Sequence, residues 1–155
     1  MPRELVLSAA FLLGRLGYSI KTQVVEEFEQ TGFSPYHYSV LALLDEGARE
    51  TQATIADALQ LDRSTLVGVL DTLEEHGLIE RRRDPNDRRR HLVSLTADGR
   101  RQLASFRKLV RRVEDEILAP LDEADRAALH RVLMQLAAHR DERYVPRSAP
   151  LASAS

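Results

Sequence analysis

The sequence contains neither cysteine nor tryptophan, and aromatic residues fill only 5% of its 155 positions. The absence of cysteine excludes disulfides, thiol redox sensing and zinc sites with cysteine ligands. No apolar run reaches the ~20 residues that a helix needs to cross a bilayer. The histidines lack the close spacing of metal ligands; they are His37, His76, His91, His130 and His139. We therefore expect no metal and no cofactor.

The motifs of catalysis are also missing. The sequence has no glycine-rich phosphate loop, nucleophile motif or paired catalytic carboxylates, so we expect no catalytic residues and no enzyme. An apolar run from Leu5 to Leu13 resembles a signal peptide. However, Glu4 offsets Arg3, and the pattern continues as a helix without a cleavage site. The expected location is the cytoplasm.

Positive charge is concentrated in one short segment. Residues 81–90 hold six arginines against Asp84 and Asp87, a local charge of +4 in a chain whose formal net charge is −2. The other 145 residues therefore sum to −6. Such a localised basic segment is typical of an electrostatic contact surface for nucleic acid. With 43% hydrophobic residues, the chain otherwise has the composition of one folded domain, with or without extensions.

Apolar periodicity predicts a mainly α fold. We expect a first helix from about Leu5 to Gln30, and a second from Pro35 to Glu46 behind the cap Ser34. A short helix follows Thr51. After the break 60–62, Asp62 caps a helix over 63–76 that Gly77 ends. Further helices are expected over about 97–120 and after Asp122. The apolar arc of the first helix is wide, which favours contact with another subunit.

Two short helices about a tight turn form a helix-turn-helix, and a hairpin follows it. The turn 84–87 has Asp first and Pro second, as in a type I turn. The alternation of His91, Val93 and Leu95 predicts a strand with these residues inward. We therefore predict a mainly α fold: a winged helix-turn-helix with a two-stranded wing hairpin and a helical dimerisation region.

The helix over 63–76 has the pattern of a DNA recognition helix. Four apolar residues share its inner face: Leu66, Val69, Leu70 and Leu73. Ser64 and Gly68 lie on the opposite face, where small side chains let a helix enter the major groove. Glycine within a helix costs roughly 1 kcal/mol relative to alanine. Either close approach to DNA or close packing of two helices would explain Gly68.

The stretch LDRSTLVGVLDTLEEHGLIERRRDPNDRRRHLVSLT, residues 61–96, together with the order of elements, resembles the MarR family of regulators. The resemblance implies a homodimer that binds a pseudo-palindromic operator in double-stranded DNA and is released by a small ligand. It also implies that Asp87 directs Arg89 into the minor groove. Many relatives have Thr-Arg at Val67-Gly68 and glycine at Gln60. Without that arginine, base reading shifts to Arg63, the hydroxyls and the wing.

The resulting candidate sites are as follows. The DNA-binding residues are Thr51, Gln52, Arg63, Ser64, Thr65, Val67, Gly68, Arg82, Arg83, Asp87, Arg88, Arg89 and Arg90. By resemblance, the candidates for binding a small aromatic or anionic effector are Arg15, Tyr18, His37, Tyr38 and Phe106. Residues 1–33 and 97–142 are assigned to dimerisation, 34–96 to the DNA-binding lobe and 143–155 to a disordered tail. No contact with a membrane is expected.

The same residues also allow other interpretations. An arginine cluster also suits RNA or a solvated surface, and a winged helix can serve as a protein–protein or RNA-binding module without an operator. Each effector candidate can instead be a packing residue.

Overall fold

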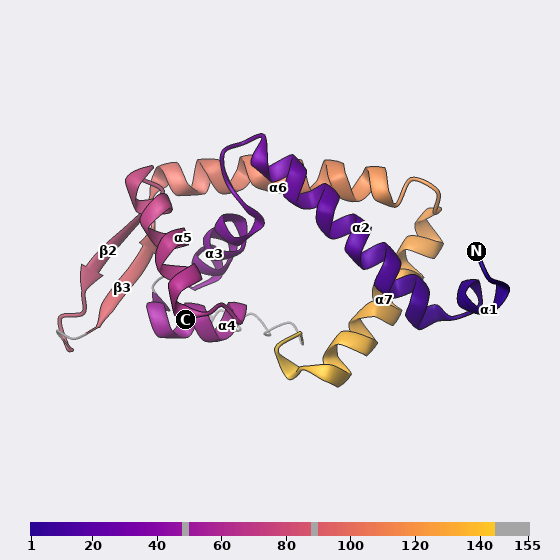
Figure 1. Ribbon diagram of the computed structural model, residues 1–155. Helices are drawn as coiled ribbons and strands as arrows, with labels where there is room; N and C mark the ends of the chain where they lie inside the picture. Colours follow the sequence, from indigo (N-terminus) through magenta and orange to yellow (C-terminus); the bar gives the residue numbers. More distant parts are fainter. Residues whose placement is uncertain (48–49, 88–89, 145–155) are drawn as a thin grey trace, which may run out of the picture. The chain divides into compact units, whose positions relative to one another are not determined.

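The computed structural model describes residues 1–47, 50–87 and 90–144 (Figure 1). The fold is mainly helical with one small sheet, as predicted. Its elements are α1 (Arg3–Val6), α2 (Ala9–Glu29), α3 (Pro35–Glu46), β1 (Glu50–Thr51), α4 (Gln52–Leu59), α5 (Arg63–Glu75), β2 (Ile79–Arg83), β3 (His91–Leu95), α6 (Ala97–Ile117), α7 (Glu123–Arg140) and the 3-10 helix η1 (Glu142–Tyr144).

Polar caps set the starts of three helices where the sequence predicts them. The Thr51 hydroxyl accepts a hydrogen bond from the Thr54 amide at 3.1 Å at the start of α4. The Asp62 and Asp122 carboxylates accept from amides three residues on, at 2.9 and 2.8 Å, at the starts of α5 and α7. Each cap satisfies an amide that has no partner within the helix.

The prediction of one unbroken first helix is wrong. The chain leaves the helical conformation at Ser8, whose backbone is extended and whose hydroxyl accepts a hydrogen bond from the Phe11 amide at 3.2 Å. Ser8 therefore caps a new helix, α2, and leaves α1 as a four-residue turn before it. The apolar periodicity continues across this break, which is why it gave no sign of the cap.

The turn between α4 and α5 contains strained backbone. Gln60 lies in the left-handed region at φ 52° and is the only non-glycine residue with positive φ in the described part of the chain. The Leu61 amide donates to the Ala56 carbonyl at 3.0 Å and closes α4 behind it. A left-handed conformation at a non-glycine residue costs roughly 1 kcal/mol or more. Gln60 occupies the position where glycine is expected by resemblance.

The sheet has three strands, whereas the sequence predicts two. Its order is β1-β3-β2, and both pairs are antiparallel. Strand β1 has only two residues, too few for alternation to reveal it. Val93 and Leu95 are buried as predicted, but His91 is exposed, a correction to the expected inward face. His91 pairs with Arg83 at the outer end of the hairpin, beyond the core.

The core lies beneath α5 and the base of the hairpin. The four predicted inner residues of α5 are all buried: Leu66, Val69, Leu70 and Leu73. Thr96 fixes the base of the hairpin, because its amide donates to the Leu78 carbonyl and its hydroxyl donates to the Gly77 carbonyl at 2.7 Å. A Cβ on Gly99 would come within 2.0 Å of the Leu78 oxygen, so α6 begins directly against this base.

The chain divides into two compact units, residues 1–114 and 115–155. In the second unit, the cap Asp122 starts α7, and Arg126 pairs with Asp115 at 2.9 Å. Arg143 and Tyr144, assigned to the tail, lie in η1. The rest of the predicted disordered tail, 145–155, lies outside the described residues. In the described ranges, no helix has the length and apolar character to cross a membrane.

Candidate nucleic-acid interface

The first turn of α5 is organised around one carboxylate. Ser64 Oγ donates to Asp62 Oδ1 at 2.6 Å, and Thr65 Oγ1 donates to Asp62 Oδ2 at 2.6 Å. These hydroxyl bonds, with the Thr65 amide, hold the pKa of the Asp62 carboxyl well below its usual range. Ser64 and Thr65 were predicted to contact DNA, and both already use their hydroxyl protons within the protein.

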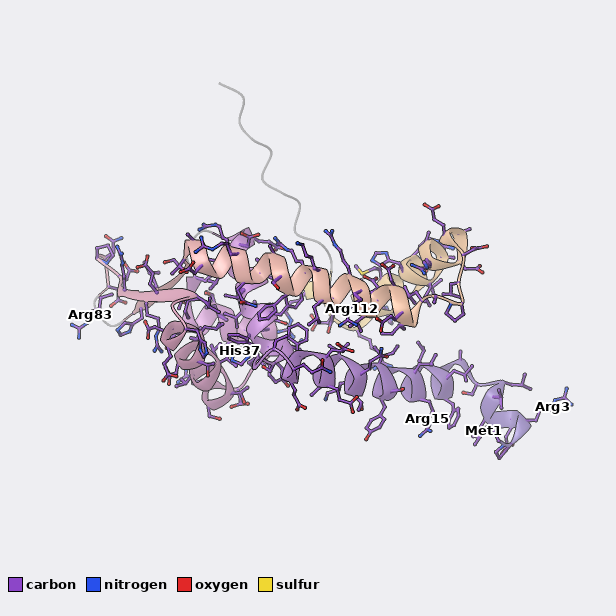
Figure 2. All side chains as sticks on the ribbon, turned by 90° about the horizontal axis from the view of Figure 1, so that it is seen from above. Met1, Arg3, Arg15, His37, Arg83 and Arg112 are labelled. Carbon is purple, nitrogen blue, oxygen red and sulfur yellow. The ribbon has the colours of Figure 1, made fainter. Side chains whose placement is uncertain are left out.

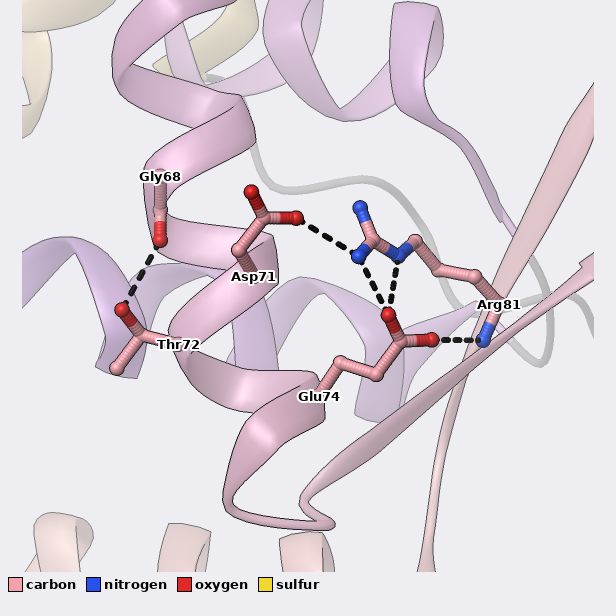
Figure 3. Close-up of polar contacts among 5 residues, drawn as sticks. All are labelled: Gly68, Asp71, Thr72, Glu74 and Arg81. Atoms are coloured by element: carbon pink, nitrogen blue, oxygen red, sulfur yellow. Dashed lines mark hydrogen bonds and ion pairs between the residues drawn. The ribbon is translucent and has the colours of Figure 1, made fainter.

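The middle of α5 presents a bare outer surface. Arg63, Val67 and Gly68 are exposed, and Val67 retains 45% of its accessible surface. A Cβ built on Gly68 would meet no atom within 4 Å among the described residues. Close packing against another helix within the described ranges therefore does not explain Gly68. The Gly68 carbonyl accepts a hydrogen bond from the Thr72 hydroxyl at 3.0 Å (Figure 3).

The predicted contacts at the start of α4 lie in a local network. Thr51 caps the helix, and the Thr54 hydroxyl lies 2.7 Å from Glu50 Oε2. Thr51 and Gln52 are half-buried. This end of α4 is therefore fixed by its own hydrogen bonds, with both side chains still partly accessible.

One arginine of the basic segment points into the protein. Arg81 is on β2 and bonds Asp71 and Glu74 of α5 (Figure 3). The hydrogen bonds between Arg81 and Glu74 lower the pKa of the Glu74 carboxyl and raise that of the Arg81 guanidinium. In sequence the six arginines look alike, so only the three-residue spacing of Asp71 and Glu74 hinted at a partner.

The other arginines of the segment lie farther out on the hairpin. Arg82 is exposed and pairs with Glu80 at 2.9 Å, and Arg83 is exposed at the end of β2 (Figure 2). Arg90 lies 3.3 Å from Asp87. Arg88 and Arg89 lie outside the described residues, so the predicted direction of Arg89 by Asp87 stays a prediction.

Hydrogen bonds that involve both a side chain and the backbone stabilise the turn of the hairpin. Asp84 Oδ1 accepts a hydrogen bond from the Asn86 amide at 2.8 Å, which is an Asx turn. The Asp84 amide donates to the Arg90 carbonyl, and the Arg90 amide donates to the Asp87 carbonyl, both at 2.9 Å. These bonds hold the exposed arginines at the far end of the hairpin.

The effector candidates fall into two places. Tyr38 and Phe106 belong to an aromatic cluster whose rings lie 5.1–6.5 Å apart and which also contains Phe28, Phe33, His37 and His76. Phe106 is 1% exposed, so it is a core residue. Arg15 and Tyr18 are exposed on α2, and Figure 2 shows Arg15 well away from His37, which lies on α3. Phe28, Phe33 and His76 were not among the predicted effector residues, because ring contacts between segments far apart in the chain do not show in the sequence.

His37 has a specific role at the start of α3. Its Nδ1 accepts a hydrogen bond from the Ser34 amide at 2.9 Å, which closes a capping box. Burial, together with nearby His76, lowers the pKa of His37 from its ordinary value. The neutral ring therefore has its proton on Nε2, which is buried without a partner among the described atoms. In the same ranges, no group of three or more His, Asp or Glu could hold a metal.

Comparison with known proteins identifies the family. The sequence profile of the MarR family matches residues 22–91. A putative transcriptional regulatory protein for the hcr operon of Thauera aromatica is 32% identical over 133 residues, covering 81% of this chain and 80% of that protein. This chain belongs to the MarR family.

Solved MarR-like structures have the same fold. A transcriptional repressor, CouR, bound to a 23-mer DNA duplex, matches with a TM-score of 0.77 and 35% identity, covering 87% of this chain and 96% of that one. CouR from Rhodococcus jostii RHA1 bound to p-coumaroyl-CoA matches with a TM-score of 0.71 and 28% identity, covering 88% and 96%. Membership of the MarR family makes this chain a transcriptional regulator.

Proposed function

We propose that this MarR-family chain is a DNA-binding repressor that acts as a homodimer on an inverted-repeat operator and dissociates when a small ligand binds. The observation that carries the proposal is the bare outer face of α5 at Gly68, joined through Arg81 to a hairpin that holds exposed arginines. In this proposal, residues 34–96 are the DNA-binding lobe, and residues 1–33 and 97–142 form the dimerisation region.

The shape of this surface favours duplex DNA over RNA or protein. A helix with small outward residues fits the major groove of B-DNA, and a cationic hairpin beside it reaches the adjacent minor groove. The major groove of A-form RNA is too narrow for a helix. The DNA-bound repressor CouR, with a similar fold, supports the same interpretation. DNA binding rather than catalysis is therefore the proposed activity. We propose the cytoplasm as the location of the protein.

The proposed effector is an aromatic anion. Arg15 can pair with a carboxylate or phosphate, and Tyr18 can stack on an aromatic ring, because both side chains are exposed on α2. His37 and Tyr38 lie apart from Arg15, in the aromatic cluster, so the buried Nε2 of His37 is a second, separate candidate donor for a polar group of the ligand. The complex of Rhodococcus CouR with p-coumaroyl-CoA supports an aromatic thioester as one form of this ligand.

The test starts from DNA that flanks the gene, which is searched for an inverted repeat. The affinity of the protein is measured for that duplex, a scrambled duplex, its single strands and RNA of the same sequence. We expect a preference of about 1,000-fold or more for the inverted repeat over the scrambled duplex. Equal affinity for duplex, single strands and RNA would instead support the module without an operator.

A footprint gives a second test of the same proposal. Two recognition helices related by a two-fold axis require half-sites about 10 bp apart, centre to centre, or a multiple of this spacing. Protection of only one half-site by the intact protein would contradict the symmetric dimer.

A further inference from the structure

A cluster of three charged side chains connects the recognition helix to the wing. We infer that Arg81 is a positioning residue that fixes the direction of the wing relative to α5, so that bases read by α5 and by the wing tip are selected together. This inference rests on the proposed DNA-binding function. We name the group Arg81, Asp71 and Glu74 the Arg81 clamp (Figure 3).

The clamp fixes both the side chain and the backbone of Arg81. Its NH2 nitrogen lies 2.7 Å from Asp71 Oδ1 and also contacts Glu74 Oε2, and its Nε donates to Glu74 Oε2 at 2.9 Å. The Arg81 amide donates to Glu74 Oε1 at 3.2 Å. A planar guanidinium with two partners has little freedom to rotate. The clamp therefore sets the orientation of β2 and not only its distance from α5.

Its position distinguishes this arginine from its neighbours. The side chain of Arg81 is 22% exposed, whereas that of Arg82, the next residue on the strand, is 75% exposed. Exposed ion pairs contribute little, while shielded pairs with several hydrogen bonds hold their geometry better. Arg81 is also committed to two carboxylates, so it is not available for a phosphate.

The clamp lies where a small rotation has a large effect. Strand β1 pairs with β3 and holds that side of the hairpin, while the clamp holds β2 to α5. Residue 86 is five residues beyond Arg81, at most about 16 Å at the rise of a strand, because β2 ends at Arg83 and a turn follows. A tilt of about 10° at Arg81 would then move the turn by up to about 3 Å, the length of a hydrogen bond. Loss of the clamp would therefore misplace the wing tip without disturbing α5.

For the two carboxylates of the clamp, charge and positioning predict different effects on DNA binding. Asp71 and Glu74 are partly exposed, with side chains 48% and 38% accessible. Converting both to amides removes negative charge beside DNA, so simple Coulomb reasoning predicts tighter binding. A positioning role predicts instead that the double variant Asp71→Asn/Glu74→Gln loses selectivity for the base pairs under the wing.

The experiment compares four proteins: wild type, Arg81→Gln, Asp71→Asn/Glu74→Gln and the control Arg82→Gln. Affinity is measured for the operator, for an operator changed only in the flank under the wing, and for one changed only under α5. Both clamp variants are expected to lose most of the wing-flank preference, about fivefold or more, and to keep the preference under α5. Arg82→Gln is expected to weaken all three duplexes by the same factor.

A second measurement does not depend on DNA. Because the chain has no cysteine, Asn86→Cys introduces a single site for a spin label in each subunit. The distance distribution between the two labels of the dimer is expected to broaden in Arg81→Gln and to stay unchanged in Arg82→Gln. Thermal unfolding of each variant shows whether a lost base preference reflects misfolding. The variant Asp71→Asn/Glu74→Gln removes the clamp independently of Arg81→Gln.

The inference is overturned if the clamp variants keep the wing-flank preference with an unchanged label distribution, or if wild type shows no such preference. If Arg81→Gln lowers the affinity for all three duplexes by the same factor, the clamp contributes only to folding and does not position the wing. These outcomes leave the proposed function intact, because wild type would still bind the operator. If wild type binds no duplex selectively, both the proposed function and this inference fail.

Discussion

A single glycine leaves the middle of α5 without a side chain, in open space. Replacing Gly68 with alanine or leucine is expected to raise the free energy of unfolding by up to about 1 kcal/mol, because both residues favour helix. If the backbone must lie close to the bases, affinity for the operator should fall in the order Gly68, Ala, Leu. Denaturant unfolding and operator titration measure the two effects separately.

Stability and operator affinity are expected to change in opposite directions in these two variants, so each variant serves as its own control. A folding defect would lower stability and affinity together, whereas contact with DNA lowers affinity while stability rises. Operator affinity that is unchanged across Gly68→Ala and Gly68→Leu would show that this face does not reach the bases.

Residue roles were predictable where geometry follows from local spacing. The caps Thr51 and Asp62 and the buried face of α5 follow from their positions along a helix. The partner of Arg81 was not predictable, because a contact between strand and helix depends on tertiary packing. The same holds for the aromatic cluster around Phe33, whose members come from α2, α3, α6, the loop at residue 33 and His76 just after α5.

At the level of a whole element, α3 starts with a cap that depends on pH. Nδ1 of His37 can accept from the Ser34 amide only while it is unprotonated. Since the pKa of His37 is lowered in the folded protein from its ordinary 6.5, the unfolded chain takes up the proton first. Stability should therefore be complete above about pH 6.5 and fall as pH decreases through the folded pKa, by at most about 1.4 kcal/mol per pH unit.

His37→Gln is the matched control for this titration. Glutamine at the same position keeps a hydrogen-bond acceptor for the cap but has no proton to gain. Unfolding measured between pH 7.5 and 5 should show a smaller decline for His37→Gln than for wild type. Identical declines in the two proteins would assign the pH dependence to other groups.

The wing can be tested through its acidic residue. Asp87 contacts Arg90 and is predicted to direct Arg89. Removing a negative charge from a DNA-facing loop predicts tighter binding by charge alone. If Asp87 orients the arginines, Asp87→Ala should weaken binding to the operator and leave binding to random duplex level or stronger. Titrations at two salt concentrations separate these cases, and uniformly tighter binding would exclude the orienting role.

The order of the elements was predictable, and two departures have the same cause. Both the break at Ser8 and the strand β1 involve two or three residues. Apolar periodicity is read over a window of many residues, so it does not reveal a change of secondary structure that spans only two or three. The helix-turn-helix and the hairpin, in contrast, follow from caps, the turn residues and the alternation of Val93 and Leu95.

For the whole molecule, the exposed leucines of α2 predict a dimer. Leu16 is 58% exposed, and Leu12 and Leu13 near it are also accessible. Apolar residues grouped in this way are typical of a surface that another subunit covers. Leu16→Glu is expected to shift sedimentation from dimer to monomer and to weaken operator binding. Lys21→Glu, roughly 140° around the same helix, introduces the same side chain as a control.

Sedimentation also tests the architecture directly. A well-folded monomer at micromolar concentration for the wild-type chain would contradict the proposed dimer. Dissociation of Lys21→Glu to the same extent as Leu16→Glu would show that charge on α2, rather than loss of the leucine, separates the subunits.

The hydrogen bonds at the start of α5 have a consequence for the operator itself. Because Ser64 and Thr65 donate their protons to Asp62, only lone pairs remain on these oxygens for a base. In the major groove, adenine N6 and cytosine N4 donate protons, whereas guanine O6 and N7 accept them. On the strand that faces this turn, duplexes selected from a random pool should therefore carry adenine or cytosine rather than guanine or thymine. Asp62→Ala would free both hydroxyls to donate, and the selected duplexes should then admit guanine at those positions.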